Sequence, residues 1–207
     1  MSTWEKFKYV KHCLFHPFDG FYEAKNRGKG SIAAATLIIA AYCLLQCVSV
    51  QYTGFIMNLN NLKRMNSVTI FISALSVLVL IVVSNWTITT LFEGKGKLKD
   101  IYMVLGYSLL PVVIIDAIVV FASNYIIEEE AVILTSISMM GLVWCCFLVV
   151  TGLCTVHEYS LAKTLVTILA TAIAALIILF LLVLFVSLVE QMWNFFYIFF
   201  KELMRRI

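Results

Sequence analysis

The stretch TLVTILATAIAALIILFLLVLFVSLV, Thr164 to Val189, contains no charged residue and is almost wholly apolar. A helix needs about 20 residues to cross the hydrocarbon core of a bilayer, which is about 30 Å thick. This stretch exceeds that length. We therefore predict that it is a transmembrane helix.

Four more stretches of the chain have the same character. Lipid offers backbone groups no hydrogen-bond partners, and none of the stretches alternates like a barrel strand, so each is expected to be a helix. The predicted fold class is all-α: a polytopic integral membrane protein with five transmembrane helices. The four further spans are Ser31 to Met57, Val68 to Leu91, Ile101 to Ile126 and Ala131 to Val156.

Composition supports the same class. The 207 residues are 62% hydrophobic and only 13% charged, with a mean hydropathy of +0.99. Soluble domains are closer to half apolar and a quarter charged, and a domain of this size cannot hide such an excess in one core. This excludes a disordered chain and a soluble enzyme. The net charge of +3 also argues against nucleic-acid binding.

No motif in the sequence indicates chemistry. There is no Gly-rich phosphate loop after a strand, no histidine pair at metal-ligand spacing and no catalytic triad. The expectation is therefore no cofactor, no metal and no enzymatic activity. Gly94 to Gly96 is interpreted as a flexible turn, His157 and Glu158 as a solvated loop pair, and the cysteines as small buried apolar residues.

Orientation is predicted from the basic residues, which are enriched in cytoplasmic loops. With the N-terminus inside, ten Lys and Arg residues fall on the cytoplasmic face and five on the other. Five spans then place the C-terminus outside, and the protein is expected in a bacterial plasma membrane. Lys97 lies on the inner face in this scheme, whereas Lys63, Arg64 and the acidic Glu129 lie on the outer face.

Amphipathic segments flank the predicted transmembrane domain, residues 31–189. In residues 1–30, Trp4, Phe7 and Phe21 recur at helical spacing among lysines, with a break at His16-Pro17. Such a helix either lies in the headgroup layer or packs on the ends of the spans. Residues 190–207 carry a polar stripe beside aromatic residues and are expected to leave the bilayer near Glu190.

Asp116 lies deep in the third span, where an ionised carboxylate is costly unless it is paired or hydrated. It could relay protons or cations, pair with a cationic group of a partner, or hydrogen-bond as a neutral acid to Gln46, Asn85 or a hydroxyl. Pro111 frees backbone groups nearby. A small-residue face at Thr167, Ala170 and Ala174 is expected to pack within the chain or in a dimer.

Two stretches resemble a known family. NWTITTLFEGKGKLKDIYMVLGYSLLPVVII, Asn85 to Ile115, is similar to the core signature of the Yip (Ypt/Rab-interacting protein) domain family. FHPFDGFYEAKNRGKGS, Phe15 to Ser31, resembles the entry segment of its bacterial branch. The most distinctive matches are the Asn-Trp that begins with Asn85 and the Gly-Tyr-Ser-Leu-Leu-Pro that contains Tyr107 and Pro111.

The resemblance implies a non-enzymatic five-span protein that works through other membrane proteins. Eukaryotic relatives act with Rab-type GTPases, but the long cytosolic extension of those relatives is missing here, so GTPase binding is not expected. Bacterial relatives point to an accessory subunit of an ATP-binding-cassette sugar importer, with a transporter permease as partner. The alternatives are a small transporter or channel using Asp116, a membrane-shaping or trafficking protein, and a homo-oligomer in the lipid bilayer.

Overall fold

The computed structural model describes residues 3–58 and 66–206, and all its regular elements are helices. Helices α3 (Ile32–Tyr52), α4 (Ser67–Leu91) and α7 (Ala131–His157) are uninterrupted, whereas the third predicted span is divided into α5 (Leu98–Ser108) and α6 (Leu110–Ala122). With α8 (Leu161–Arg206), the described residues contain five segments long and apolar enough to cross a membrane. The all-α membrane fold is therefore confirmed.

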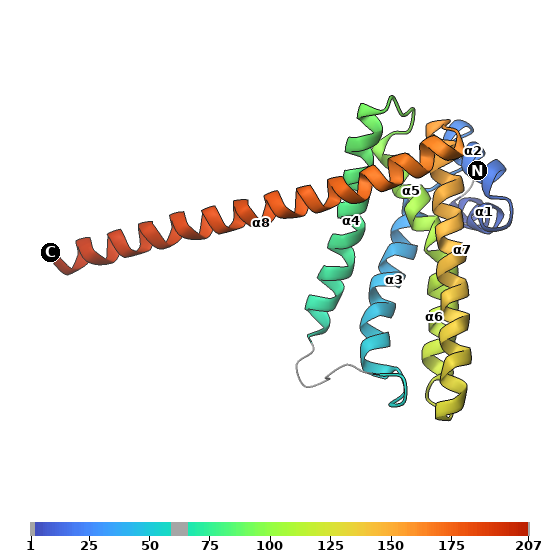
Figure 1. The fold of residues 1–207 in the computed structure, drawn as a ribbon, viewed down its shortest axis with the longest axis horizontal. Helices are drawn as coiled ribbons and strands as arrows, with labels where there is room; N and C mark the ends of the chain where they lie inside the picture. The colour runs from blue at the N-terminus through green and yellow to red at the C-terminus, as the bar shows by residue number, and fades with distance from the viewer. Residues whose placement is uncertain (1–2, 59–65, 207) are drawn as a thin grey trace.

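The break between α5 and α6 follows from Pro111. Proline has no N–H and its ring clashes with the preceding helical turn, but it is tolerated in the first turn of a helix. Pro111 accordingly occupies the first turn of α6, and Leu109 lies between the two helices. The third span therefore has a change of direction near its middle, as Figure 1 shows.

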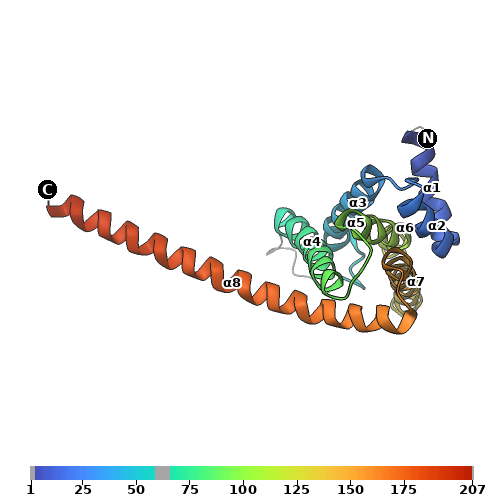
Figure 2. The same ribbon diagram turned by 90° about the horizontal axis from the view of Figure 1, so that it is seen from above.

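Helix α5 is the centre of the packing. More than half of the third span is buried inside the protein, against about a quarter or less of the other spans. Close approach depends on small residues: a Cβ on Gly106 would lie 2.7 Å from the Cβ of Ala35, and one on Gly152 would lie 2.6 Å from Val104. Helices α3, α4 and α7 surround α5, as the view from above shows (Figure 2).

The N-terminal segment forms two helices at one end of this bundle. Helix α1 (Thr3–Phe15) ends before His16, and α2 (Pro17–Asn26) begins at Pro17, so the predicted break is found. Phe21 is buried where α2 packs on α7, whereas Phe15 and Phe18 are exposed. The side chains of Trp4 and Phe7 lie outside the described residues, as do Lys63 and Arg64.

The expectation for the cysteines holds in part. All six cysteines are free. Cys13, Cys43 and Cys145 are buried, but Cys146, in α7, is exposed on the surface of the bundle. Burial raises the pKa of the Cys13 thiol, in α1, to about 12. This thiol is therefore protonated and unreactive at neutral pH.

Helix α8 differs from the other spans. It is one continuous helix that crosses α4 at a steep angle and extends far beyond the bundle (Figures 1 and 2). Only its first turns pack: Thr164, Thr167 and Thr171 are buried, whereas residues 176–205 are exposed or half-exposed. No change of structure marks Glu190, the point at which the sequence predicted that the helix would leave the bilayer.

Candidate functional site

Asp116 contacts a hydroxyl on the neighbouring helix. The Ser138 hydroxyl, on α7, donates a hydrogen bond to Asp116 Oδ1, on α6. Gln46 and Asn85 make no hydrogen bond with Asp116, and among the described residues no basic side chain pairs with it. Of the alternatives drawn from the sequence, the structure displays the contact with a hydroxyl. A role for Asp116 in binding a partner stays a prediction.

Asn85 joins α4 to α8. Its side chain is 3% exposed, and its Nδ2 donates to Thr171 Oγ1 over 3.1 Å. Thr171 in turn donates to the carbonyl of Thr167 over 2.7 Å. The Oδ1 of Asn85 is buried and has no hydrogen-bond partner among the described residues. This contact uses the small-residue face of α8 for packing within the chain, which was one of the two alternatives for that face.

Tyr107 joins α5 to the start of α3. Its hydroxyl is buried, accepts a hydrogen bond from the Ser31 N–H over 2.7 Å and donates to the Ser31 carbonyl over 3.0 Å. Ser31 also caps α3, since its hydroxyl accepts from the N–H of Ala34. The first backbone N–H groups of a helix have no partner within the helix, so a buried helix start needs such outside partners. Tyr107 therefore fixes the point where the chain enters the first span.

These polar residues do not form one site. Asp116, Asn85 and Tyr107 each make a separate contact between two helices, and Pro111 only breaks the third span. No group of three or more His, Cys, Asp or Glu side chains in the described part of the chain could hold a metal ion. The intramembrane polar residues act in this structure as links between helices.

A second polar cluster, missed by the sequence analysis, is the His157 junction, formed by Gly94, Gly96, His157, Tyr159 and Glu158. The His157 ring is 2% exposed, and its Nδ1 accepts a hydrogen bond from the Gly96 N–H over 3.3 Å. The ring stacks on Tyr159, with centroids 5.3 Å apart. The interpretation of His157 as solvated is therefore wrong.

The two glycines of the α4–α5 loop are close to His157 because of their size. A Cβ on Gly94 would lie 2.5 Å from His157 Nδ1, and one on Gly96 would lie 2.6 Å from the Val156 side chain. Such distances cannot be accommodated without moving the loop or the ring. The Gly-x-Gly interpreted from sequence as a flexible turn is therefore a packed contact with the end of α7.

Two lysines hold Glu158 at the edge of this junction. Lys95 pairs with Glu158 at 2.6 Å and Lys25 at 3.2 Å, and Lys25 Nζ also donates to the Val156 carbonyl over 2.8 Å. Glu158 has a left-handed backbone, φ 57°, and ends α7. The hydrogen bonds from Lys95 and Lys25 lower the pKa of the Glu158 carboxyl. The ion pairs connect α2, the α4–α5 loop and α7 at one end of the bundle.

Comparison with known protein families matches residues 11–185 to the Yip1 domain. Searches among curated proteins and solved structures find no match. The matched residues cover the His157 junction, all the polar contacts above and about half of α8, and they include both stretches on which the resemblance rested. Assignment to the bacterial branch stays a prediction. The chain belongs to the Yip1 domain family.

Proposed function

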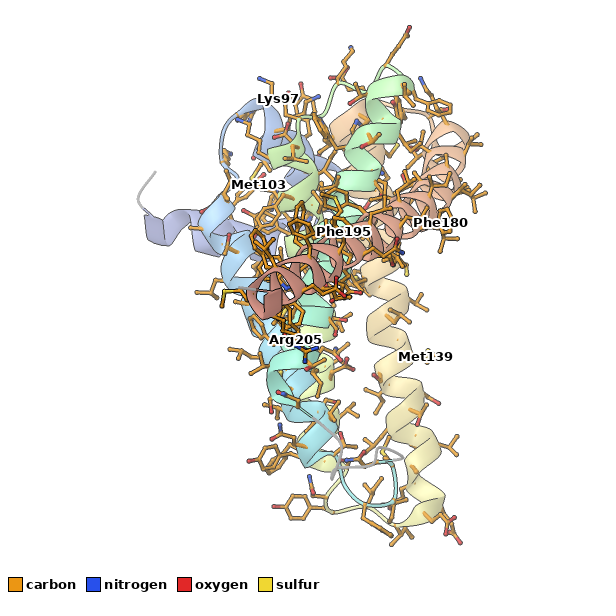
Figure 3. All side chains as sticks on the ribbon, turned by 90° about the vertical axis from the view of Figure 1, so that its left-hand side faces the viewer. Lys97, Met103, Met139, Phe180, Phe195 and Arg205 are labelled. Carbon is orange, nitrogen blue, oxygen red and sulfur yellow. The ribbon has the colours of Figure 1, made fainter. Side chains whose placement is uncertain are left out.

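We propose that this chain is a non-enzymatic scaffold of the membrane, which binds other membrane proteins through the distal part of α8, Leu176 to Arg205. One observation carries the proposal: no other described element packs on this part of the helix. Phe185 is 67% exposed and Trp193 is 74% exposed. In Figure 3 the side chains of Phe195 and Arg205 project from α8 in front of the bundle.

The chemistry of the distal part of α8 suits a protein partner. Lipid is as apolar as a leucine side chain, so helices associate in membranes through close packing and a few polar contacts. The distal part provides both, because a polar stripe runs beside aromatic side chains. No residue of the stripe contacts another described element. The stripe consists of Glu190, Asn194, Tyr197, Lys201 and Arg205.

We propose a permease of an ATP-binding-cassette sugar importer as the partner and a plasma membrane as the location, on the strength of the family resemblance. The distribution of charge supports a cytoplasmic N-terminus. Helix α2, the α4–α5 loop and the first turns of α5 and α8 lie at the same end of the bundle as α1 (Figure 1), and we call this end the basic end. These segments contain Lys25, Lys95, Lys97, Lys99 and Lys163. Positively charged residues are enriched on the cytoplasmic side.

Affinity purification tests this proposal. The tagged full-length chain is solubilised in a gentle detergent at native expression level, and mass spectrometry identifies the proteins that come with it. Trp193→Ala should reduce recovery of the partner, because the Trp193 side chain is 74% exposed and no other described helix packs on it. Trp144→Ala, on the exposed face of α7, is the matched control and should leave recovery unchanged.

The same preparation can refute the proposal. Equal recovery of the same proteins by the Trp193 and Trp144 variants would exclude the distal part of α8 as the binding surface. A lone monomer that conducts ions or solutes in proteoliposomes would instead support a small transporter or channel.

A further inference from the structure

An apolar groove lies between α3, α4 and α5. It encloses about 410 Å³, within the range of ~300–1,000 Å³ that is typical of small-molecule sites. Its walls are aliphatic: Ile39 comes from α3, Leu75 and Val79 from α4, and Leu105 from α5. The groove opens on the side of the bundle, between segments that are expected to be in lipid.

The groove has one polar end, which lies at the basic end of the bundle. Lys99, in the first turn of α5, lines it together with Thr36 and Tyr102. The Tyr102 hydroxyl donates to Thr36 Oγ1 over 3.0 Å, and Thr36 donates to the Ile32 carbonyl over 3.0 Å. Two hydroxyl-bearing side chains and one lysine therefore line the same end of the groove.

Lys99 differs from three other lysines of the basic end. Lys25 and Lys95 pair with Glu158, and Lys29 pairs with Glu23 at 2.6 Å. Lys99 has neither an ion pair nor a hydrogen bond with any residue that the structure describes. The lysine that lines this apolar groove therefore has no counter-ion among the described residues.

The length of the groove matches one leaflet of a bilayer. Leu75 and Val83 both line it, and eight residues of helix separate them, a rise of about 12 Å at about 1.5 Å per residue. Half of a hydrocarbon core is about 15 Å thick. An amphiphile whose headgroup lies beside Lys99 would thus extend along the groove to near the bilayer midplane.

We propose that this groove binds one anionic glycerophospholipid, with an acyl chain against the aliphatic walls and the phosphate beside Lys99. The Tyr102 hydroxyl can exchange its exposed hydrogen bond to Thr36 for one to a headgroup oxygen, whereas the Thr36 hydroxyl continues to donate to the Ile32 carbonyl. A zwitterionic lipid would fill the groove equally well. Its ammonium or choline group, however, would offset the attraction between Lys99 and the phosphate, so the anionic lipid is preferred.

Native mass spectrometry of the purified full-length chain tests the proposal. The chain in detergent is titrated with dioleoyl-phosphatidylglycerol or with dioleoyl-phosphatidylcholine. We expect saturable binding of one phosphatidylglycerol and weaker binding of phosphatidylcholine. Lys99→Gln should lower the affinity for phosphatidylglycerol about fivefold, since one basic side chain near a lipid surface contributes roughly that factor. Lys97→Gln, two residues earlier and outside the groove, should not lower it.

A second pair of variants tests the walls. Val79→Phe places an aromatic ring in the groove and should abolish retention of the bound lipid, whereas Val77→Phe, on a lipid-exposed part of the same helix, should not. Equal affinities of the Lys99 and Lys97 variants would overturn the proposal. So would retention by Val79→Phe, a lipid count that rises without saturating, or a co-purified protein helix that occupies the groove in place of the lipid.

Discussion

Replacing Tyr107 by Phe removes the hydroxyl that accepts from the Ser31 N–H over 2.7 Å and donates to the Ser31 carbonyl over 3.0 Å. The Ser31 carbonyl keeps a partner, because it also accepts from the N–H of Ala35 over 3.2 Å. The Ser31 N–H is left with none among the described residues. Ser31 is 8% exposed, so water has little access to replace the lost acceptor.

The cost of this change follows from the orphaned donor. A buried polar group left without a partner costs about 1–3 kcal/mol. For a chain of 150–250 residues, each 1 kcal/mol lowers the unfolding temperature by about 2–4 °C. We therefore expect Tyr107→Phe to lower the thermal unfolding temperature of the purified protein in detergent by about 2–12 °C.

Tyr102→Phe is the matched control. It also removes one tyrosine hydroxyl from α5, but the hydrogen bond that it breaks, to Thr36, is exposed, and water can replace it. Its effect should remain within about 0.5 kcal/mol. If Tyr107→Phe shifts the unfolding temperature no more than Tyr102→Phe does, the contact of Tyr107 with Ser31 does not stabilise the entry to α3.

Three further predictions concern the membrane span, the topology and the basic end. Asp116→Asn should change the unfolding temperature little, because an amide oxygen can still accept from the Ser138 hydroxyl. A decrease of about 3–5 kcal/mol in the free energy of unfolding, typical of a broken buried charge pair, would contradict this. An impermeant thiol reagent on intact cells should label Glu129→Cys and miss Lys97→Cys, and the reverse pattern would invert the topology. The lowered pKa of Glu158 means that its ion pairs stabilise the fold above the usual carboxyl pKa of 4.5 and are lost as pH falls through the lowered pKa. Glu158→Gln should therefore reduce the loss of stability as pH falls below 4.5, and an unchanged profile would argue against the pairing.

The number and position of the membrane helices could be predicted from the sequence because lipid imposes two simple conditions. A segment must be about 20 residues long, and it must satisfy its own backbone. The five spans and the break at His16-Pro17 follow from these conditions and from proline chemistry. The family could be predicted as well, because its signature lies in continuous stretches of sequence.

The buried faces of the helices could not be predicted in the same way. In water, the apolar stripe of a helix marks the face that packs, but a helix in lipid is apolar on every side. The sequence therefore did not show that Asn85 contacts Thr171, or that α8 packs only through its first turns and then extends beyond the bundle.

The His157 junction is the clearest case of a feature that only the tertiary structure decided. Gly96 and His157 are 61 residues apart in the chain. Gly96 lies in the α4–α5 loop, and His157 is the last residue of α7. Gly96 lies between Lys95 and Lys97, and Glu158 follows His157, which is the pattern of a solvated loop. The packing of α4, α5 and α7 brings them together, and the missing Cβ atoms of Gly94 and Gly96 leave the space that the imidazole ring fills.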